Sequence, residues 1–268
     1  MVDPFDAAET RKQQPAFNAP GIVLAFIIGI LGAFAIFNYL PEQSQEDLMV
    51  QFALFPGRFT AVPGHPDMVF PGGIAGDVWS LFTYTFMHGS WTHAIVNSIW
   101  LLAFGSPVAQ RIGSLRFVLF YFTCGIVGAF THVWLNAGSL VPVIGASAAI
   151  SGLMGGAARF VFLADGPLGG LGGGYASTAP RAQASIGRAL TDRRVLIFVG
   201  VWIGLNFLFG PTGITLTGQA VNVAWEAHLG GFLAGLLLFG FFDPYRTSPS
   251  GGPGNVGYGE WSGRNRLP

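Results

Sequence analysis

The sequence predicts an all-α integral membrane protein with six transmembrane helices, the fourth of them short and recessed. Of its 268 residues, 51% are hydrophobic and only 10% are charged. The mean hydropathy is +0.53. About a quarter of the residues of a soluble domain are charged. The low charge and the long apolar runs therefore indicate that this chain is embedded in a membrane.

Six apolar windows are long enough to span, or nearly span, a hydrocarbon core of about 30 Å. They cover residues 21–40, 91–108, 117–137, 147–163, 195–209 and 222–242. The fourth window corresponds to a helix of only about 25 Å at a rise of about 1.5 Å per residue. Because this helix is shorter than the core, its first residue is expected to lie below the membrane surface. We therefore predict a six-helix membrane domain over residues 21–243.

The segments outside these windows are rich in Gly, Pro and polar residues. Residues 1–20 contain acidic residues and no apolar core, which predicts a short cytoplasmic arm rather than a signal peptide. Residues 41–76 are interpreted as a long outer loop, and residues 77–88 as an aromatic stretch in the membrane interface. Residues 165–192 are predicted to form a flexible cytoplasmic loop, and residues 244–268 a disordered tail.

Positive charges are distributed unevenly between the two sides of the predicted domain. If the N-terminus is cytoplasmic, all of the 13 Lys and Arg residues except Arg58 lie on the cytoplasmic side. Membrane proteins place an excess of Lys and Arg in their cytoplasmic loops. Both termini are therefore predicted to be cytoplasmic, and the second, fourth and sixth helices run inward from the outer face.

The sequence gives no sign of a cofactor, a metal centre or a nucleic-acid site. Its single cysteine, Cys124, lies within an apolar run, so no disulfide framework or cysteine-based metal site is expected. No phosphate-binding glycine loop, cluster of metal ligands or basic patch is found in the sequence. The expected partners are the lipid bilayer and proteins within it, with no nucleic acid.

Each of the three inward-running helices has unusual polar residues near its start. His93 and Asn97 lie four residues apart on one face of the second helix, Ser147 begins the fourth, and His228 lies near the start of the sixth. At about 1.5 Å per residue, His93, Asn97 and His228 are all expected within about 10 Å of the outer surface. Polar groups at this depth are unfavourable unless they meet one another or line a wet cavity. The set therefore predicts a functional site.

The residue types at this site fit acyl-transfer chemistry. Small residues spaced four apart on the fourth and sixth helices let the two backbones approach closely. The glycines concerned are Gly152, Gly156, Gly231 and Gly235. Close approach brings the Ser147 hydroxyl within reach of the His228 imidazole, as a nucleophile and its general base require. A helix N-terminus at Ser147 favours an oxyanion, and His93 and Asn97 are candidate donors to it.

These motifs resemble those of the rhomboid family of intramembrane serine proteases over roughly residues 78–242, in the same order and on the expected helices. They are Phe86-Met87-His88, His93-Ala94-Ile95-Val96-Asn97, Gly145-Ala146-Ser147 and Ala227-His228-Leu229-Gly230-Gly231-Phe232-Leu233-Ala234-Gly235. The resemblance implies a Ser147/His228 catalytic dyad and an oxyanion hole of His93, Asn97 and the Ser147 amide. It also implies cleavage of single-span membrane proteins near the outer face, without metal or cofactor, in the bacterial inner membrane.

Two positions depart from the family pattern. The usual Gly-x-Ser-Gly is Gly145-Ala146-Ser147-Ala148 here, and the aromatic residue that some members place four residues after the nucleophile is Ser151. The second change removes a stacking partner for His228. Neither change removes a reacting group, so the protease interpretation stands.

Two other functional classes fit the sequence less well. An inactive rhomboid-like factor that binds membrane proteins would keep the scaffold and lack the serine or the histidine, whereas both are present. A small transporter would show repeated halves and broken helices, and no internal repeat is found.

The fifth helix and residues 70–76 of the first loop are expected to be the least constrained elements and to form the gate for substrate.

Four further polar residues are interpreted as lying outside the catalytic set. His88 is interpreted as structural, while His132 and Asn206 are interpreted as hydrogen-bonding partners for a neighbouring helix. Glu226 is rejected as a third catalytic residue. A side chain two residues before His228 points about 160° away from it around the helix.

Overall fold

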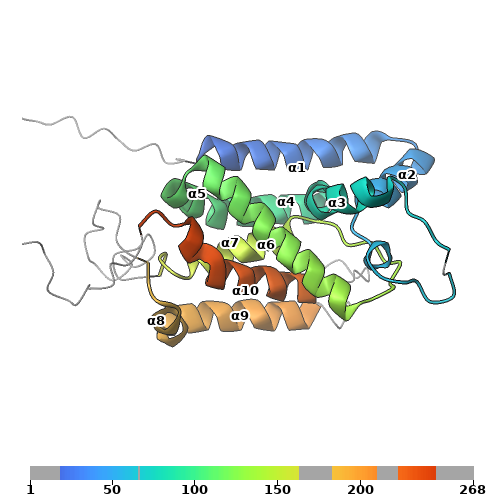
Figure 1. Cartoon of the computed structure of the whole chain (residues 1–268). Helices are drawn as coiled ribbons and strands as arrows, with labels where there is room; N and C mark the ends of the chain where they lie inside the picture. Colours follow the sequence, from blue (N-terminus) through green and yellow to red (C-terminus); the bar gives the residue numbers. More distant parts are fainter. Residues whose placement is uncertain (1–18, 66, 163–182, 210–222, 246–268) are drawn as a thin grey trace, which may run out of the picture.

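The computed structural model describes residues 19–65, 67–162, 183–209 and 223–245, which are mostly helical (Figure 1). The predicted N-terminal arm lies outside the described residues except for its last two positions. Residues 163–182, which include most of the predicted cytoplasmic loop at 165–192, and the tail beyond residue 245 also lie outside them.

Every predicted apolar window contains a helix. The four longest helices are α1 (Gly21–Tyr39), α6 (Ser114–Leu135), α9 (Arg193–Phe209) and α10 (Trp225–Phe242). The second window begins with α4 (Trp91–Trp100) and continues through the π-helical turn η3 (Leu101–Gly105) into α5 (Ser106–Ile112), whereas the fourth contains α7 (Ser147–Ala157). Among the described residues, α1, α6 and α10 are long and apolar enough to cross a membrane. Six crossings and a recessed fourth helix stay predictions.

The first loop contains more regular structure than its Pro and Gly content suggested. It holds α2 (Glu42–Phe52) and the short turn η1 (Pro56–Arg58), and α3 (Gly73–Thr83) followed by η2 (Tyr84–Phe86) leads to the second window. The polar sequence of α2 contains no membrane-length apolar run, so a search for membrane spans passes over it. Its Glu, Gln, Leu and Met residues nevertheless favour a helix. A second short helix, α8 (Ile186–Thr191), lies in the predicted cytoplasmic loop.

Helix α7 is the centre of the bundle. Every residue from Ala148 to Ala157 is buried, and α6 and α10 pack against α7 and against each other. Helices α1 and α9 lie at opposite edges of the bundle in Figure 1. A helix that is apolar on all sides is expected in such an enclosed position.

Glycines allow α7 to approach its neighbours at backbone distance. A Cβ atom on Gly235 would overlap the carbonyl oxygen of Gly152, and one on Gly231 would overlap the carbonyl oxygen of Ala148. The predicted close approach of these two helices is therefore confirmed. Gly156 differs from these glycines, because it faces the rings of Phe120 and Phe239.

Helix α6 also joins this contact, which the sequence pattern did not indicate. A Cβ atom on Gly128 would lie 2.5 Å from the carbonyl oxygen of Ala227 and 3.0 Å from the Cβ atom of Ala148. The three helices therefore meet directly beside Ser147 and His228, where only small residues fit.

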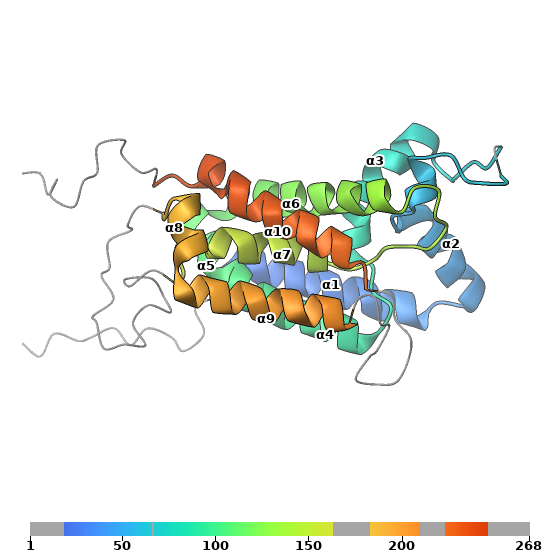
Figure 2. The ribbon, with the colours of Figure 1, turned by 90° about the horizontal axis from the view of Figure 1, so that it is seen from below.

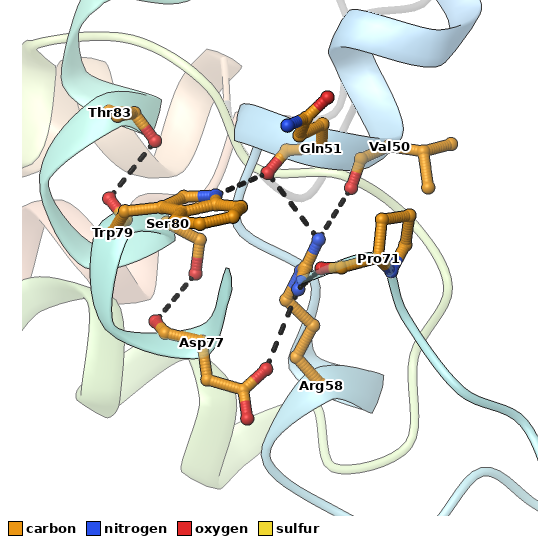
Figure 3. A network of polar contacts seen from close by, with 8 residues as sticks. All are labelled: Val50, Gln51, Arg58, Pro71, Asp77, Trp79, Ser80 and Thr83. Carbon is orange, nitrogen blue, oxygen red and sulfur yellow. Dashed lines mark hydrogen bonds and ion pairs between the residues drawn. The ribbon is translucent and has the colours of Figure 1, made fainter. Parts of the chain in front are cut away.

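A buried arginine organises the end of the molecule that contains α2 and α3 (Figure 3). The side chain of Arg58 is 0% exposed, and its guanidinium lies 4.9 Å above the centre of the Phe70 ring. It donates hydrogen bonds to the carbonyls of Val50 (2.7 Å), Pro71 (3.1 Å) and Gln51 (3.4 Å) and to the carboxylate of Asp77 (3.5 Å). Burial lowers the pKa of Arg58, and the hydrogen bond that Arg58 donates to the Asp77 carboxylate opposes this effect.

This arginine connects α2, α3 and the chain between them. Two further bonds join α3 to the end of α2, from Trp79 Nε1 to the Gln51 carbonyl at 2.8 Å and from Thr83 Oγ1 to the Phe52 carbonyl at 2.7 Å. Phe70 and Pro71 are therefore held by Arg58, whereas residues 71–75 are exposed. A gate formed by residues 70–76 and α9 stays a prediction.

Candidate active site

A tight turn before α7 positions Ser147. Gly145 has a φ of +114°, a region that favours glycine because a Cβ atom is strained there. Its N–H donates to the Tyr84 carbonyl at 2.9 Å. Two residues earlier, Val143 forms an isolated antiparallel bridge with Leu54. The segment leading into Ser147 is thus fastened to the organised first loop.

Ser147 is the first residue of α7, where backbone N–H groups have no partner within the helix. The N-cap residue, Ala146, has no side-chain oxygen that could accept from them. The positive end of the helix dipole is located at the same point. This turn therefore presents hydrogen-bond donors to a negatively charged oxygen beside the serine.

The predicted pair of reacting groups lies within hydrogen-bond distance. Ser147 Oγ is 2.7 Å from Nε2 of His228, which projects from the first turn of α10. Both residues are partly buried. A neutral imidazole whose Nε2 carries no hydrogen can accept the serine proton at this distance.

The other ring nitrogen of His228 contacts a residue on α9. His228 Nδ1 lies 2.6 Å from Oδ1 of Asn206, and Nδ2 of Asn206 donates to the Trp202 carbonyl at 2.8 Å. The predicted interhelical hydrogen bond of Asn206 is confirmed, but His228 was not predicted as its partner. A lone Asn in an apolar helix signals a polar contact, although nothing in the sequence identifies the helix that supplies it.

His93 and Asn97 lie beside the turn that leads into Ser147. A Cβ atom on Gly145 would lie 2.7 Å from both Cε1 and Nε2 of His93, and 3.5 Å from Nδ2 of Asn97. The N-cap residue of α4, Ser90, accepts from the backbone N–H of His93 at 3.1 Å. The four predicted site residues therefore gather around one turn.

His88 holds Asn97 in place. Asn97 Nδ2 is 3.0 Å from Nε2 of His88, whose Nδ1 lies 3.2 Å from the Phe86 carbonyl. Because a carbonyl only accepts, Nδ1 carries the hydrogen and Nε2 accepts from Asn97. Burial lowers the pKa of His88 to about 4, so the ring is neutral at pH 7. The Asn97 amide has a second hydrogen for another acceptor.

Glu226 is directed toward α6 rather than toward His228. Its Oε2 lies 3.4 Å from Nδ1 of His132, so His132 contacts a neighbouring helix as the sequence suggested. Among the described residues, no group of three or more His, Cys, Asp or Glu side chains is arranged to hold a metal ion.

Comparison with known proteins identifies the family of this chain. A sequence model of the rhomboid domain matches residues 75–243, more than half of the chain. The chain therefore belongs to the rhomboid family, whose members act on transmembrane substrates within the bilayer, and it is a multi-pass membrane protein of a protease family.

Three relatives illustrate the extent of the similarity. RHOMBOID-like protein 4 of Arabidopsis thaliana is 24% identical over 82% of this chain and 52% of that protein. RHOMBOID-like protein 1 of the same species is 26% identical over 87% of this chain and 58% of that protein. Putative rhomboid protease YdcA of Bacillus subtilis is 36% identical over 31% of this chain and 42% of that protein. The chain thus spans about half the length of these curated relatives.

Proposed function

We propose that this chain is an intramembrane serine endopeptidase with Ser147 as the nucleophile and His228 as the general base. The observation that carries the proposal is the 2.7 Å separation between Ser147 Oγ and His228 Nε2 at the start of a buried helix. Membership of a protease family supports the same reaction class.

The reaction follows from the chemistry of these groups. Ser147 Oγ attacks the scissile carbonyl carbon while its proton passes to Nε2 of His228. The carbonyl oxygen becomes an oxyanion, which the Ser147 N–H, Asn97 and His93 stabilise. His228 then donates the proton to the leaving amine. A water molecule, activated by the same base, hydrolyses the acyl-enzyme and restores the serine.

The substrates under this proposal are single-span proteins cut near the outer end of their span. A carbonyl inside a stable transmembrane helix is hydrogen-bonded and shielded by side chains. It becomes open to attack only where the helix unwinds, so residues such as Gly and Pro favour cleavage. Helix α9 is the proposed gate, because most of its apolar side chains are exposed at the edge of the bundle.

Labelling with a fluorophosphonate probe tests the proposed function directly. These probes phosphonylate a serine, with loss of fluoride, only when a neighbouring base activates the hydroxyl. We expect the detergent-solubilised protein to be labelled at Ser147, and Ser147→Ala to remain unlabelled. Absence of labelling on a folded wild-type protein would favour a rhomboid-like binding factor without protease activity.

We further propose that the protein lies in a bacterial inner membrane with both termini in the cytoplasm. Helices α2 and α8 lie at opposite ends of the bundle (Figure 2). The charge distribution predicts that the α2 end faces outward. In a Cys124→Ser background, Gln43→Cys is expected to react with a membrane-impermeant thiol reagent on intact cells. Gly187→Cys should react only after permeabilisation, and reaction of both before it would contradict this orientation.

A further inference from the structure

We propose that Asn206 is a positioning residue for His228, so that the site operates as a Ser147–His228–Asn206 relay extending across three helices. This inference rests on the proposed function and assigns a role to a residue outside the predicted dyad. It depends on the 2.6 Å contact between Asn206 Oδ1 and His228 Nδ1.

The amide oxygen selects one tautomer of the histidine. An amide oxygen only accepts hydrogen bonds, so His228 Nδ1 must carry the hydrogen when it contacts Asn206. The opposite nitrogen, Nε2, is then free to accept the proton of Ser147. The alternative tautomer carries its hydrogen on Nε2 and cannot act as a base toward the serine.

The orientation of Asn206 is itself fixed by its neighbours. Its Nδ2 group donates to the Trp202 carbonyl one turn earlier, which directs Oδ1 toward His228. The Trp202 ring stacks on Phe232 of α10 with ring centres 4.7 Å apart. On the following turn, Phe207 contacts Trp225 at 5.2 Å. Two aromatic pairs thus hold this part of α9 against α10.

A neutral amide suits a site at membrane depth. A carboxylate there would have to be desolvated, which is unfavourable without a paired charge. The nearest acidic side chain on α10, Glu226, pairs with His132 instead. Ser151 bonds back to the Ser147 carbonyl at 2.7 Å and offers His228 no ring to stack on. Asn206 therefore supplies the contact that orients the imidazole.

The kinetic test compares two substitutions at position 206. Asn206→Leu keeps a similar size and removes the acceptor, whereas Asn206→Asp keeps an acceptor. We expect Asn206→Leu to lower the maximum rate of Ser147 phosphonylation by a fluorophosphonate about 10- to 100-fold, part of the range for general-base catalysis. The probe concentration at half-maximum rate should stay within about twofold. Leu205→Ala, exposed on the same turn, should match the wild type.

Asn206→Asp should recover most of the maximum rate and change its pH dependence. A carboxylate beside the ring favours imidazolium, so the acidic limb of the pH–rate profile should move to higher pH. His93 and His132 also lie near His228, and they are the same in every variant. A wild-type maximum rate in Asn206→Leu, or no recovery in Asn206→Asp, would overturn the proposal.

A spectroscopic measurement separates this inference from the proposed function. In ¹⁵N-histidine-labelled protein, NMR reports which ring nitrogen carries the hydrogen, and a His228→Gln variant assigns the signal. We expect the Nδ1–H tautomer in the wild type and its loss in Asn206→Leu, whether or not the protein cleaves any substrate. An Nε2–H tautomer in the wild type would show that Asn206 does not position the base.

Discussion

Ser147→Ala and His228→Ala are each expected to reduce cleavage of a single-span reporter to background, a loss of about 10⁴-fold or more. The serine supplies the atom that attacks, and the histidine must remove its proton in the same step. Removing either residue leaves the other without a function, because the effects of residues that act as a unit are not additive. The measurement is the initial cleavage rate in proteoliposomes at saturating reporter.

The control for this experiment is Ser98→Ala. Ser98 is also a buried serine, and its hydroxyl bonds to the Ala94 carbonyl of its own helix at 2.8 Å. Its loss should leave cleavage near the wild-type rate. A second reporter, with Leu in place of the helix-weakening residues, should be cut more slowly. If Ser147→Ala or His228→Ala retained substantial cleavage while correctly folded, the assignment of the dyad would be wrong.

Asn97→Ala and His93→Ala are expected to lower kcat by about 10- to 1000-fold, the range for removing one preorganised oxyanion donor. Both side chains lie against Gly145, two residues before the nucleophile. The oxyanion forms only in the transition state, so KM should change much less than kcat.

The contact between Asn97 and His88 offers a competing structural explanation. Asn97 also ties α4 to the segment before it through His88. His88→Leu removes this tie and leaves the Asn97 amide in place. We expect it to lower the melting temperature while retaining more activity than Asn97→Ala. If Asn97→Ala and His93→Ala lost only thermal stability and had a normal kcat, both residues would be structural.

The sequence was informative where a physical constraint leaves few alternatives. Apolar windows must be helical in a membrane, and each of the six contains a helix. Polar side chains at membrane depth must find partners, which explains why Ser147, His228, His93 and Asn97 gather around one turn. The structure shows that these side chains lie close together. The substitutions described above test whether the residues are catalytic.

The features that escaped prediction depend on contacts between segments distant in sequence. Nothing in the α9 sequence indicates which helix Asn206 faces, and its contact with His228 is set by the packing of aromatic rings. The Arg58 network could not be predicted from the sequence for a different reason. Three of its four acceptors are backbone carbonyls, which every residue type carries, so no side-chain motif marks them.

Because α7 is enclosed by its neighbours, it should tolerate smaller side chains better than larger ones. Its residues from Ala148 to Ala157 are buried and mostly small, so they have little side-chain volume to lose. A Cβ atom on Gly155 would overlap the carbonyl oxygen of Phe232 on α10, and one on Gly152 would overlap the Cys124 side chain on α6. Extra atoms in a packed core are destabilising. In a library of variants, these two glycines should therefore reject even alanine, whereas the alanines of α7 should accept Gly and reject larger residues. The proposed nucleophile therefore lies at the start of a helix whose buried residues leave little space for movement.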